Sequence, residues 1–205
     1  MESIMKKSAI IILMLSVIVI FSSRSAECAS AQSYFEKGNT CYNDGEYDNA
    51  IKDYTEAISI NADFADAYYN RGQAYYKKEK YDDAIRDYTR AIELNIRTAE
   101  IYNFRSLAYY KRGMYKNTID DETTAISIKP DFGVAYHNRG IAYAKRGQYD
   151  EAIQDYNKAI SLVPNYSDAY FSRGVAYFRK ASEDFKKSCD RGNKFACENL
   201  KQLHE

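Results

Sequence analysis

Apolar side chains recur at helical spacing through most of this chain, in pairs of short blocks separated by polar turns. Tyr68, Gly72 and Tyr75 lie at i, i+4 and i+7, which predicts one face of a first helix. After a polar turn, the stripe from Tyr81 to Ile92 predicts the face of a second helix. Neither helix can bury its stripe alone, so the pattern predicts helical hairpins that stack on their neighbours.

The hairpins repeat with a period of 34 residues. The marker of the period is a column of tyrosines at Tyr34, Tyr68, Tyr102, Tyr136 and Tyr170. Glycine follows four residues after each tyrosine, except at Ser106. A helical pattern with this period predicts an all-α helix-turn-helix solenoid. Four full units are expected at 32–64, 65–98, 99–132 and 133–166, and a shortened fifth unit with a capping helix at 167–205.

The repeated positions resemble the tetratricopeptide repeat family. The fourth unit carries the family's pattern of aromatic, glycine, alanine and proline positions at Tyr136, Gly140, Tyr143, Tyr149, Ala152, Tyr156, Ala159 and Pro164. The resemblance covers residues 32 to about 166 and implies a right-handed superhelix. It also implies that the first helix of each unit lines a concave groove that binds peptides or other proteins.

Two units depart from the repeated pattern. In the third unit Ser106 replaces glycine, Thr118 replaces alanine and Glu122 replaces an aromatic residue. An unpaired buried carboxylate costs several kcal/mol, so we expect Glu122 to be exposed, paired or in a loosened repeat. The fifth unit lacks about five turn residues after Lys180.

The cysteines suggest a closed C-terminal end. Cys189 and Cys197 lie eight residues apart around a turn-like stretch, a spacing that suits a disulfide between two helix ends better than a metal site. Residues 181 to 203 also resemble cysteine-rich SEL-like repeats, whose cysteines at this spacing form a disulfide. We therefore expect a stapled cap with Phe195, Leu200 and Leu203 facing inward. Cys41 occupies a packing column and is expected to be a buried, inert thiol.

Charge is balanced and periodic. Lys plus Arg and Asp plus Glu each number 29, which gives no overall field for a nucleic-acid partner. Basic residues on the first helices stand sixteen positions before acids on the second helices, as in Arg139 and Asp155. Matched acids favour intramolecular ion pairs over a basic stripe for an anionic ligand, with 0 to about 1 kcal/mol for each pair that is exposed.

The first 31 residues predict a secretory signal. Lys6 and Lys7 precede an apolar run from Ala9 to Phe21, and a small-residue pattern places the cut before Gln32. An uncleaved membrane anchor and lipid attachment at Cys28 are the alternatives. Export to the periplasm or cell envelope is expected, with no stable membrane span after cleavage.

The candidate binding residues lie on the first helices, beside the packing stripe. Their columns vary in residue type within a regular frame, which is typical of a binding surface. The candidates are Phe35, Asn39, Tyr42, Tyr69, Gln73, Tyr76, Lys77, Asn103, Tyr110, Lys111, His137, Lys145, Phe171, Phe178 and Arg179. Aromatic rings supply contact area, and the basic residues suit acidic groups of a partner. The competing interpretation is that the rings shield neighbouring helices and the lysines form a solvated face.

No catalytic motif supports an enzyme, and no cofactor or metal is expected. The predicted function is an exported scaffold that binds an unidentified protein or peptide segment in the groove. The alternatives are a module that binds cell-wall peptidoglycan fragments and an accessory subunit of an envelope enzyme. Glu100 and Phe104 occupy positions where a tetratricopeptide clamp for chaperone tails needs basic residues, so such a clamp is not expected. The oligomeric state stays open.

Overall fold

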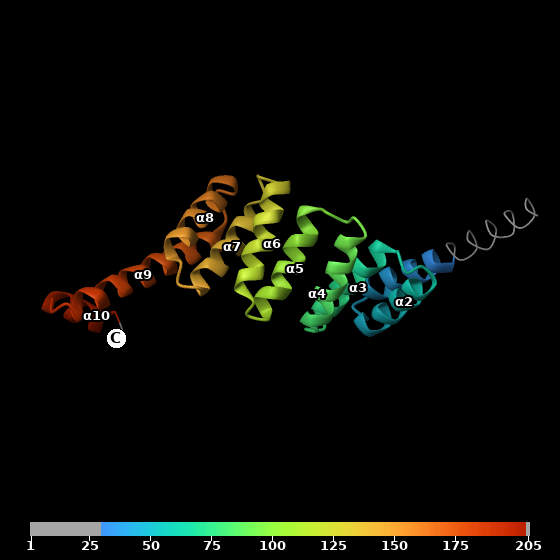
Figure 1. Ribbon diagram of the computed structural model, residues 1–205, viewed down its shortest axis with the longest axis horizontal. Coiled ribbons are helices and arrows are strands. Elements are labelled where there is room, and N and C mark those ends of the chain that lie inside the picture. The colour runs from blue at the N-terminus through green and yellow to red at the C-terminus, as the bar shows by residue number, and fades with distance from the viewer. Residues whose placement is uncertain (1–29, 204–205) are drawn as a thin grey trace, which may run out of the picture. The chain divides into compact units, whose positions relative to one another are not determined.

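A computed structural model describes residues 30–203. The predicted signal segment therefore lies, except for its last two residues, outside the described residues, as does Cys28. After a helical segment at 30–43, the helices are α2 (Tyr47–Ile60), α3 (Ala65–Lys77), α4 (Tyr81–Glu93), α5 (Ala99–Lys111), α6 (Tyr115–Ile128), α7 (Gly133–Lys145), α8 (Tyr149–Leu162), α9 (Ser167–Asp190) and α10 (Lys194–Gln202) (Figure 1). The all-α fold is as predicted.

The chain divides into two compact units that each contain several repeats: a first unit, Met1–Ile96, and a second unit, Arg97–Glu205. In the first unit α2 packs on α3 and α3 on α4. In the second unit each helix from α5 to α10 packs on the next along the chain. Helices α3, α5, α7 and α9 begin at residues 65, 99, 133 and 167, where the sequence pattern starts each repeat. Between residues 30 and 203, no helix is both long and apolar enough to cross a membrane.

Each hairpin turn contains one residue with left-handed backbone. Gly45, Gly113 and Gly147 have φ of 79°, 73° and 75°, and Glu79 takes the same position with φ of 58°. This conformation is accessible to glycine without a Cβ penalty, which is why glycine recurs there. The left-handed residue ends the first helix and lets the second fold back against it.

A tyrosine ring lying on a glycine holds the two helices of a hairpin together. Tyr54, Tyr88 and Tyr156 are buried, with at most 2% of each residue exposed. A Cβ added at Gly38, Gly72 or Gly140 would lie 2.7 to 2.9 Å from the ring of Tyr54, Tyr88 or Tyr156 respectively. Glycine is therefore required wherever the ring is present.

The predicted ion pairs form in all four full hairpins. Nitrogen to oxygen distances are 2.7 Å for Arg71–Asp87, 2.8 Å for Arg105–Asp121 and Arg139–Asp155, and 3.2 Å for Lys37–Asp53. The four aspartates are buried, so the small value expected for exposed pairs does not apply to them. Removing one partner of a buried pair leaves an uncompensated charge, which costs more than the pair itself contributes.

Glu122 is fully buried on α6. Of the three outcomes that the sequence left open, the structure therefore shows a carboxylate that is paired with hydrogen-bond donors. Its Oε1 accepts hydrogen bonds from Asn103 Nδ2 at 2.8 Å, from Asn138 Nδ2 at 3.2 Å and from the Ser106 hydroxyl. Oε2 has no hydrogen-bond partner among residues 30–203. Burial raises the pKa of Glu122 to about 8, although the three hydrogen bonds oppose this shift.

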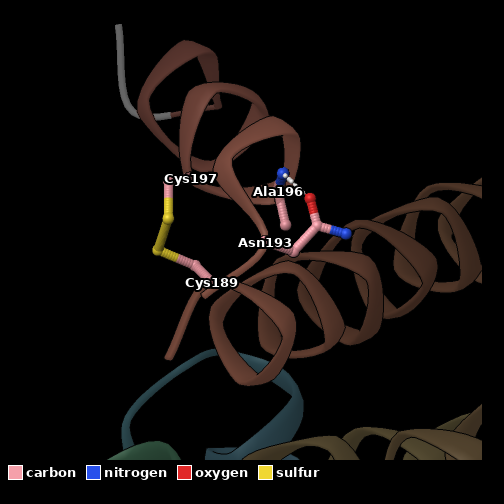
Figure 2. The surroundings of a disulfide bond; sticks show 4 residues. All are labelled: Cys189, Asn193, Ala196 and Cys197. Carbon is pink, nitrogen blue, oxygen red and sulfur yellow. Dashed lines mark hydrogen bonds between the residues drawn. A yellow bond between two sulfur atoms is a disulfide. The ribbon is translucent and has the colours of Figure 1, made fainter. Parts of the chain in front are cut away.

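The fifth repeat differs from the others because its two halves form one helix. Helix α9 runs for 24 residues without a turn, and α10 packs against its end (Figure 1). Cys189 and Cys197 form the predicted disulfide, with Cα atoms 4.8 Å apart. Figure 2 shows the disulfide beside Asn193, whose Oδ1 caps α10 by accepting from the backbone N–H of Ala196 at 3.2 Å.

The expectation that Phe195 faces inward is wrong. Its side chain is 77% exposed, and Ala196 is the buried residue of α10. Ala196, Leu200 and Leu203 recur at i, i+4 and i+7 and therefore form the face toward α9, whereas Phe195 lies about 100° around the helix from that face.

Candidate functional site

A hollow in the second unit forms where the repeat pattern omits one ring. In the first three hairpins a tyrosine near the end of the first helix packs on one at the start of the second, with ring centroids 5.4 to 5.6 Å apart. The pairs are Tyr42–Tyr47, Tyr76–Tyr81 and Tyr110–Tyr115. The fourth hairpin keeps Tyr149 but has Ala144 in the other position. Space that a ring fills elsewhere is therefore open beside Ala144.

The hollow has a volume of about 520 Å³ and is lined by residues of α5, α7, α8 and α9. Four of the predicted site residues contribute to it: Tyr110, Lys145, Phe171 and Arg179. Ile141 and Val175 complete its apolar wall. The structure thus brings together side chains from three different first helices.

The chemistry of the hollow is apolar and basic. Lys145 and Arg179 are both exposed at its rim, and none of the described residues that line it is an aspartate or glutamate. A cation at the edge of an apolar surface attracts a carboxylate more strongly than it does in open water, because part of the solvent is displaced. The hollow is therefore suited to an apolar side chain that lies close to an acidic group.

The aromatic residues of α9 are unusually accessible. Phe171 is 75% exposed and Phe178 is 45% exposed, although both belong to columns whose members on earlier helices are half-buried or buried. Exposed rings on a rigid helix offer contact area to a partner at small entropic cost. Lys111 is also exposed but does not line the hollow.

Two of the predicted site residues have buried side chains that are hydrogen-bonded to other residues of the second unit. Asn103 is 6% exposed and donates to Glu122. His137 is 7% exposed, with Nε2 3.1 Å from the Ser172 hydroxyl and Nδ1 3.0 Å from the Tyr166 hydroxyl. Burial lowers the pKa of His137, which keeps the ring neutral near pH 7. These two side chains offer little surface to a ligand.

The predicted site residues of the first unit mostly contact one another and their neighbours. Phe35 packs on Phe64 with ring centroids 4.8 Å apart, and Tyr69 lies 6.1 Å from Tyr88. Asn39 Oδ1 accepts from Tyr54 Oη at 2.8 Å and from Asn70 Nδ2 at 2.7 Å. In this unit the competing interpretation, in which the rings shield neighbouring helices, accounts for these contacts. Gln73 is half-buried, and Lys77 is exposed.

Ala144, Ile141 and Val175 also line the hollow; they belong to the same first-helix columns as the predicted site residues but are not among the candidates. The signal was available in the sequence, since Ala144 stands in a column of Tyr42, Tyr76, Tyr110 and Phe178. An alanine in an aromatic column indicates missing volume, and missing volume becomes a hollow only if the backbone does not close over it.

Among residues 30–203, no group of three or more His, Cys, Asp or Glu side chains is placed to hold a metal ion. The Cys41 thiol lies 3.6 Å from Asp53 Oδ2, and burial raises the pKa of this thiol, which makes it a poor nucleophile.

Three family models match the sequence. A TPR repeat model matches residues 38–79 and 142–180, and two tetratricopeptide repeat models match residues 65–95 and 123–154. These ranges end at residue 180, so the resemblance of the C-terminal end to SEL-like repeats stays a prediction. No curated protein matches the chain.

Solved structures share the fold. The chain is similar to the MamA protein, at 25% identity and a TM-score of 0.72, with 85% of this chain and 90% of that chain covered. It is similar in fold to YrrB, titled a TPR protein with an unusual peptide-binding site, at 22% identity and a TM-score of 0.67, covering 82% and 90%. The first TPR domain of Spaghetti (RPAP3), bound to an HSP90 peptide, matches at 26% identity and a TM-score of 0.54, covering 55% and 90%. With its helical hairpins, glycine and tyrosine columns and matching family models, this chain belongs to the tetratricopeptide repeat family.

Proposed function

We propose that this chain is an exported, non-enzymatic scaffold that binds a peptide or protein segment in the hollow of its second unit. The observation that carries the proposal is the open space beside Ala144, walled by Tyr110, Ile141 and Phe171 and bordered by Lys145 and Arg179. A segment with an apolar or aromatic side chain next to a carboxylate matches this surface in shape and charge.

Two structural relatives support the choice of ligand class. YrrB is described as having a peptide-binding site, and the Spaghetti domain is bound to an HSP90 peptide. In this chain Glu100 forms an ion pair with Lys129 at 3.6 Å and stands where a chaperone-tail clamp needs a cation. We therefore propose a ligand other than a chaperone tail.

Selection from a displayed peptide library on the immobilised protein tests the proposal. We expect enriched peptides to carry an apolar residue beside an acidic one and to bind at least about tenfold more weakly to the Ala144→Tyr variant. This variant places in the hollow the ring that the first three hairpins carry, so its hairpin has a packing partner in Tyr149. Lys145→Gln should also weaken binding of these peptides, whereas Lys77→Gln in the first unit, which does not line the hollow, is its matched control and should not.

Equal binding of the enriched peptides to wild type and Ala144→Tyr would contradict the hollow as the site. Affinity capture from an envelope extract addresses the other function classes. Recovery of a stoichiometric envelope enzyme would indicate an accessory subunit, and retention on isolated sacculus after salt washing would indicate a cell-wall module.

Export is proposed on two features. The basic and apolar pattern of residues 1–31 matches a secretory signal, and a disulfide between Cys189 and Cys197 is stable in an oxidising compartment. N-terminal sequencing of the protein recovered from the envelope fraction should begin at Gln32. A protein that keeps Met1 and stays with the membrane would indicate an uncleaved anchor instead.

A further inference from the structure

The face of α9 that should hold the second helix of the fifth hairpin is uncovered. A Cβ added at Gly174 would meet nothing within 4 Å, whereas the matching Gly140 lies against the Tyr156 ring. Tyr177 is 52% exposed, whereas Tyr143 in the same column packs on the cluster around Tyr156. A hollow of about 370 Å³ surrounds Gly174. This face has the features of a hairpin interface without its second helix.

The residues of the missing second helix are present in the chain. The first, second and fourth hairpins share a second-helix pattern of an alanine, an aspartate three residues later and a ring one residue after that, as in Ala152, Asp155 and Tyr156. Ala181, Asp184 and Phe185 repeat this pattern in the second half of α9. The missing five residues correspond to Gly147–Glu151 and include the left-handed glycine of the turn. Without that glycine, α9 continues as one helix.

A continuous helix separates the two halves of the interface. Gly174 and Phe185 are eleven residues apart, which is about 16 Å along the helix axis, so Phe185 cannot reach Gly174 of its own α9. Arg173 donates to Asn157 Oδ1 at 2.6 Å instead of pairing with an aspartate as Arg139 does, and the exposed Asp184 lies 3.9 Å from Lys187. Helix α9 therefore carries both partners of each interface contact, but the partners are too far apart along the helix to touch each other.

We propose that a second copy of this chain covers the face, with the two α9 helices packed antiparallel about a twofold axis. In such a pair Phe185 of each copy lies on Gly174 of the other, and Asp184 of each pairs with Arg173 of the other. This restores between copies the two contacts that the other hairpins make internally. The complementary charges of Arg173 and Asp184, with both halves of the contact on the same helix, select a second copy over an unrelated partner.

The spacing along α9 suits this pairing, and its stripe is exposed from Tyr170 to Ala181 and half-buried at Phe185 and Ser188, where α10 packs on α9. Tyr170, Gly174, Tyr177, Ala181, Phe185 and Ser188 recur at i, i+4, i+7, i+11, i+15 and i+18, so they form one stripe. Small residues at 174, 181 and 188 alternate with rings, which allows close approach of the two helices. Phe171, Val175 and Arg179 line both this hollow and the hollow beside Ala144, but they are not members of the stripe, so the dimer does not depend on the proposed peptide site.

Sedimentation equilibrium of the purified full chain tests the proposal. We expect a dimer, and we expect Gly174→Leu to weaken dimerisation about 10- to 100-fold, because an inserted side chain overpacks the interface. In the monomer the same side chain meets open space, so helicity and the thermal midpoint should not fall. A wild-type chain that is monomeric at about 100 µM, or a dimer that survives Gly174→Leu, would overturn the proposal.

Charge reversal supplies an independent test. Asp184→Arg should weaken the dimer, and adding Arg173→Asp should restore it, because the pair then forms with opposite polarity. Glu183→Arg, next to Asp184 but on the side of α9 away from the stripe, is the matched control and should leave dimerisation unchanged. Insertion of a copy of Gly147–Glu151 after Lys180 should allow the fifth hairpin to close within one chain and give a monomer. Failure of the double variant to recover, or a dimer after the insertion, would each contradict the pairing.

Discussion

The third and fourth hairpins of the chain, which both lie in the second unit, pair their helices in the same way but differ in the chemistry of the interface between them. In α7 and α8 the Tyr156 ring lies on Gly140. In α5 and α6 the matching positions are Glu122 and Ser106, joined by a hydrogen bond. A carboxylate is smaller than a tyrosine ring, and the space it leaves accommodates a serine side chain. The two positions therefore change together within one chain: a ring on the second helix goes with glycine on the first, and an acid on the second helix goes with a serine hydroxyl on the first.

This comparison shows that the repeat tolerates a polar interface if donors are supplied from both sides. Asn103 and Ser106 on α5 and Asn138 on α7 all donate to the same oxygen of Glu122. Buried polar groups are stable when hydrogen-bonded, and costly when one partner is removed. The buried acid of the third hairpin thus depends on Asn138 of the next hairpin, whereas the contact of Tyr156 with Gly140 lies within the fourth.

Dependence on pH is the largest expected difference between the two hairpins. The pKa of Glu122 is about 8 in the folded state and near 4.5 when unfolded, so the folded state holds an extra proton between these values. The free energy of unfolding should therefore fall as pH rises from about 5 to about 8, with a slope of at most about 1.4 kcal/mol per pH unit. Urea denaturation at several pH values measures this slope.

Glu122→Gln mimics the protonated acid and should flatten the profile over the same range. A profile of the wild type that is already flat would mean that Glu122 is ionised throughout, and that the three donors outweigh burial.

Transferring the acid to the fourth hairpin should be strongly destabilising. Tyr156→Glu removes the ring from Gly140 and buries a carboxylate that has no serine hydroxyl at position 140. We expect a loss of about 3 kcal/mol in the free energy of unfolding, from the lost packing and the buried charge. Tyr156→Phe keeps the ring and is the control. Equal stability of the two variants would show that the ring contributes little to this hairpin.

Converting the third hairpin to the aromatic type should require two changes. Glu122→Tyr alone should cost about 2 kcal/mol, because its ring would meet the Ser106 side chain where the other hairpins have glycine. Adding Ser106→Gly should recover this loss. A double-mutant cycle by urea denaturation should give a coupling of at least about 1 kcal/mol. Additive effects would mean that the two positions do not change together for steric reasons.

The ion pairs should behave alike in both hairpins and show the smallest effect. Arg105→Lys and Arg139→Lys each replace a two-point contact with Asp121 or Asp155 by a single charge. We expect each to cost about 1 kcal/mol, since lysine cannot reproduce the planar fork of arginine. Circular dichroism melts of the two variants check this. A large difference between them would show that the hairpins differ beyond the interface positions.

Much of the fold was predictable because its main contacts join residues that are close together in the sequence. Spacing along the chain identified the hairpins, the ion pairs of sixteen-residue separation and the disulfide between Cys189 and Cys197. Each of these depends on residues within one or two helices. Helical geometry converts such spacing directly into proximity.

The candidate site was less predictable because it depends on several helices at once. Asn103 and His137 belong to the expected groove columns but are buried, since Glu122 on α6 and Tyr166 and Ser172 further along the chain bond to them. No spacing within one helix reports a partner 19 to 35 residues away. The hollow beside Ala144 likewise needed the positions of α5, α7, α8 and α9 together.

By itself the sequence determined the repeated hairpin, because its apolar stripes can be buried only against copies of themselves. It also determined where the pattern fails, at Glu122, at Ala144 and after Lys180. Only the tertiary structure decided what each failure becomes: a hydrogen-bonded buried acid, an open hollow and an uncovered helix face. The reason is that the neighbouring helices decide the outcome of a missing or added side chain: they fill the space, bond to the group or leave it exposed.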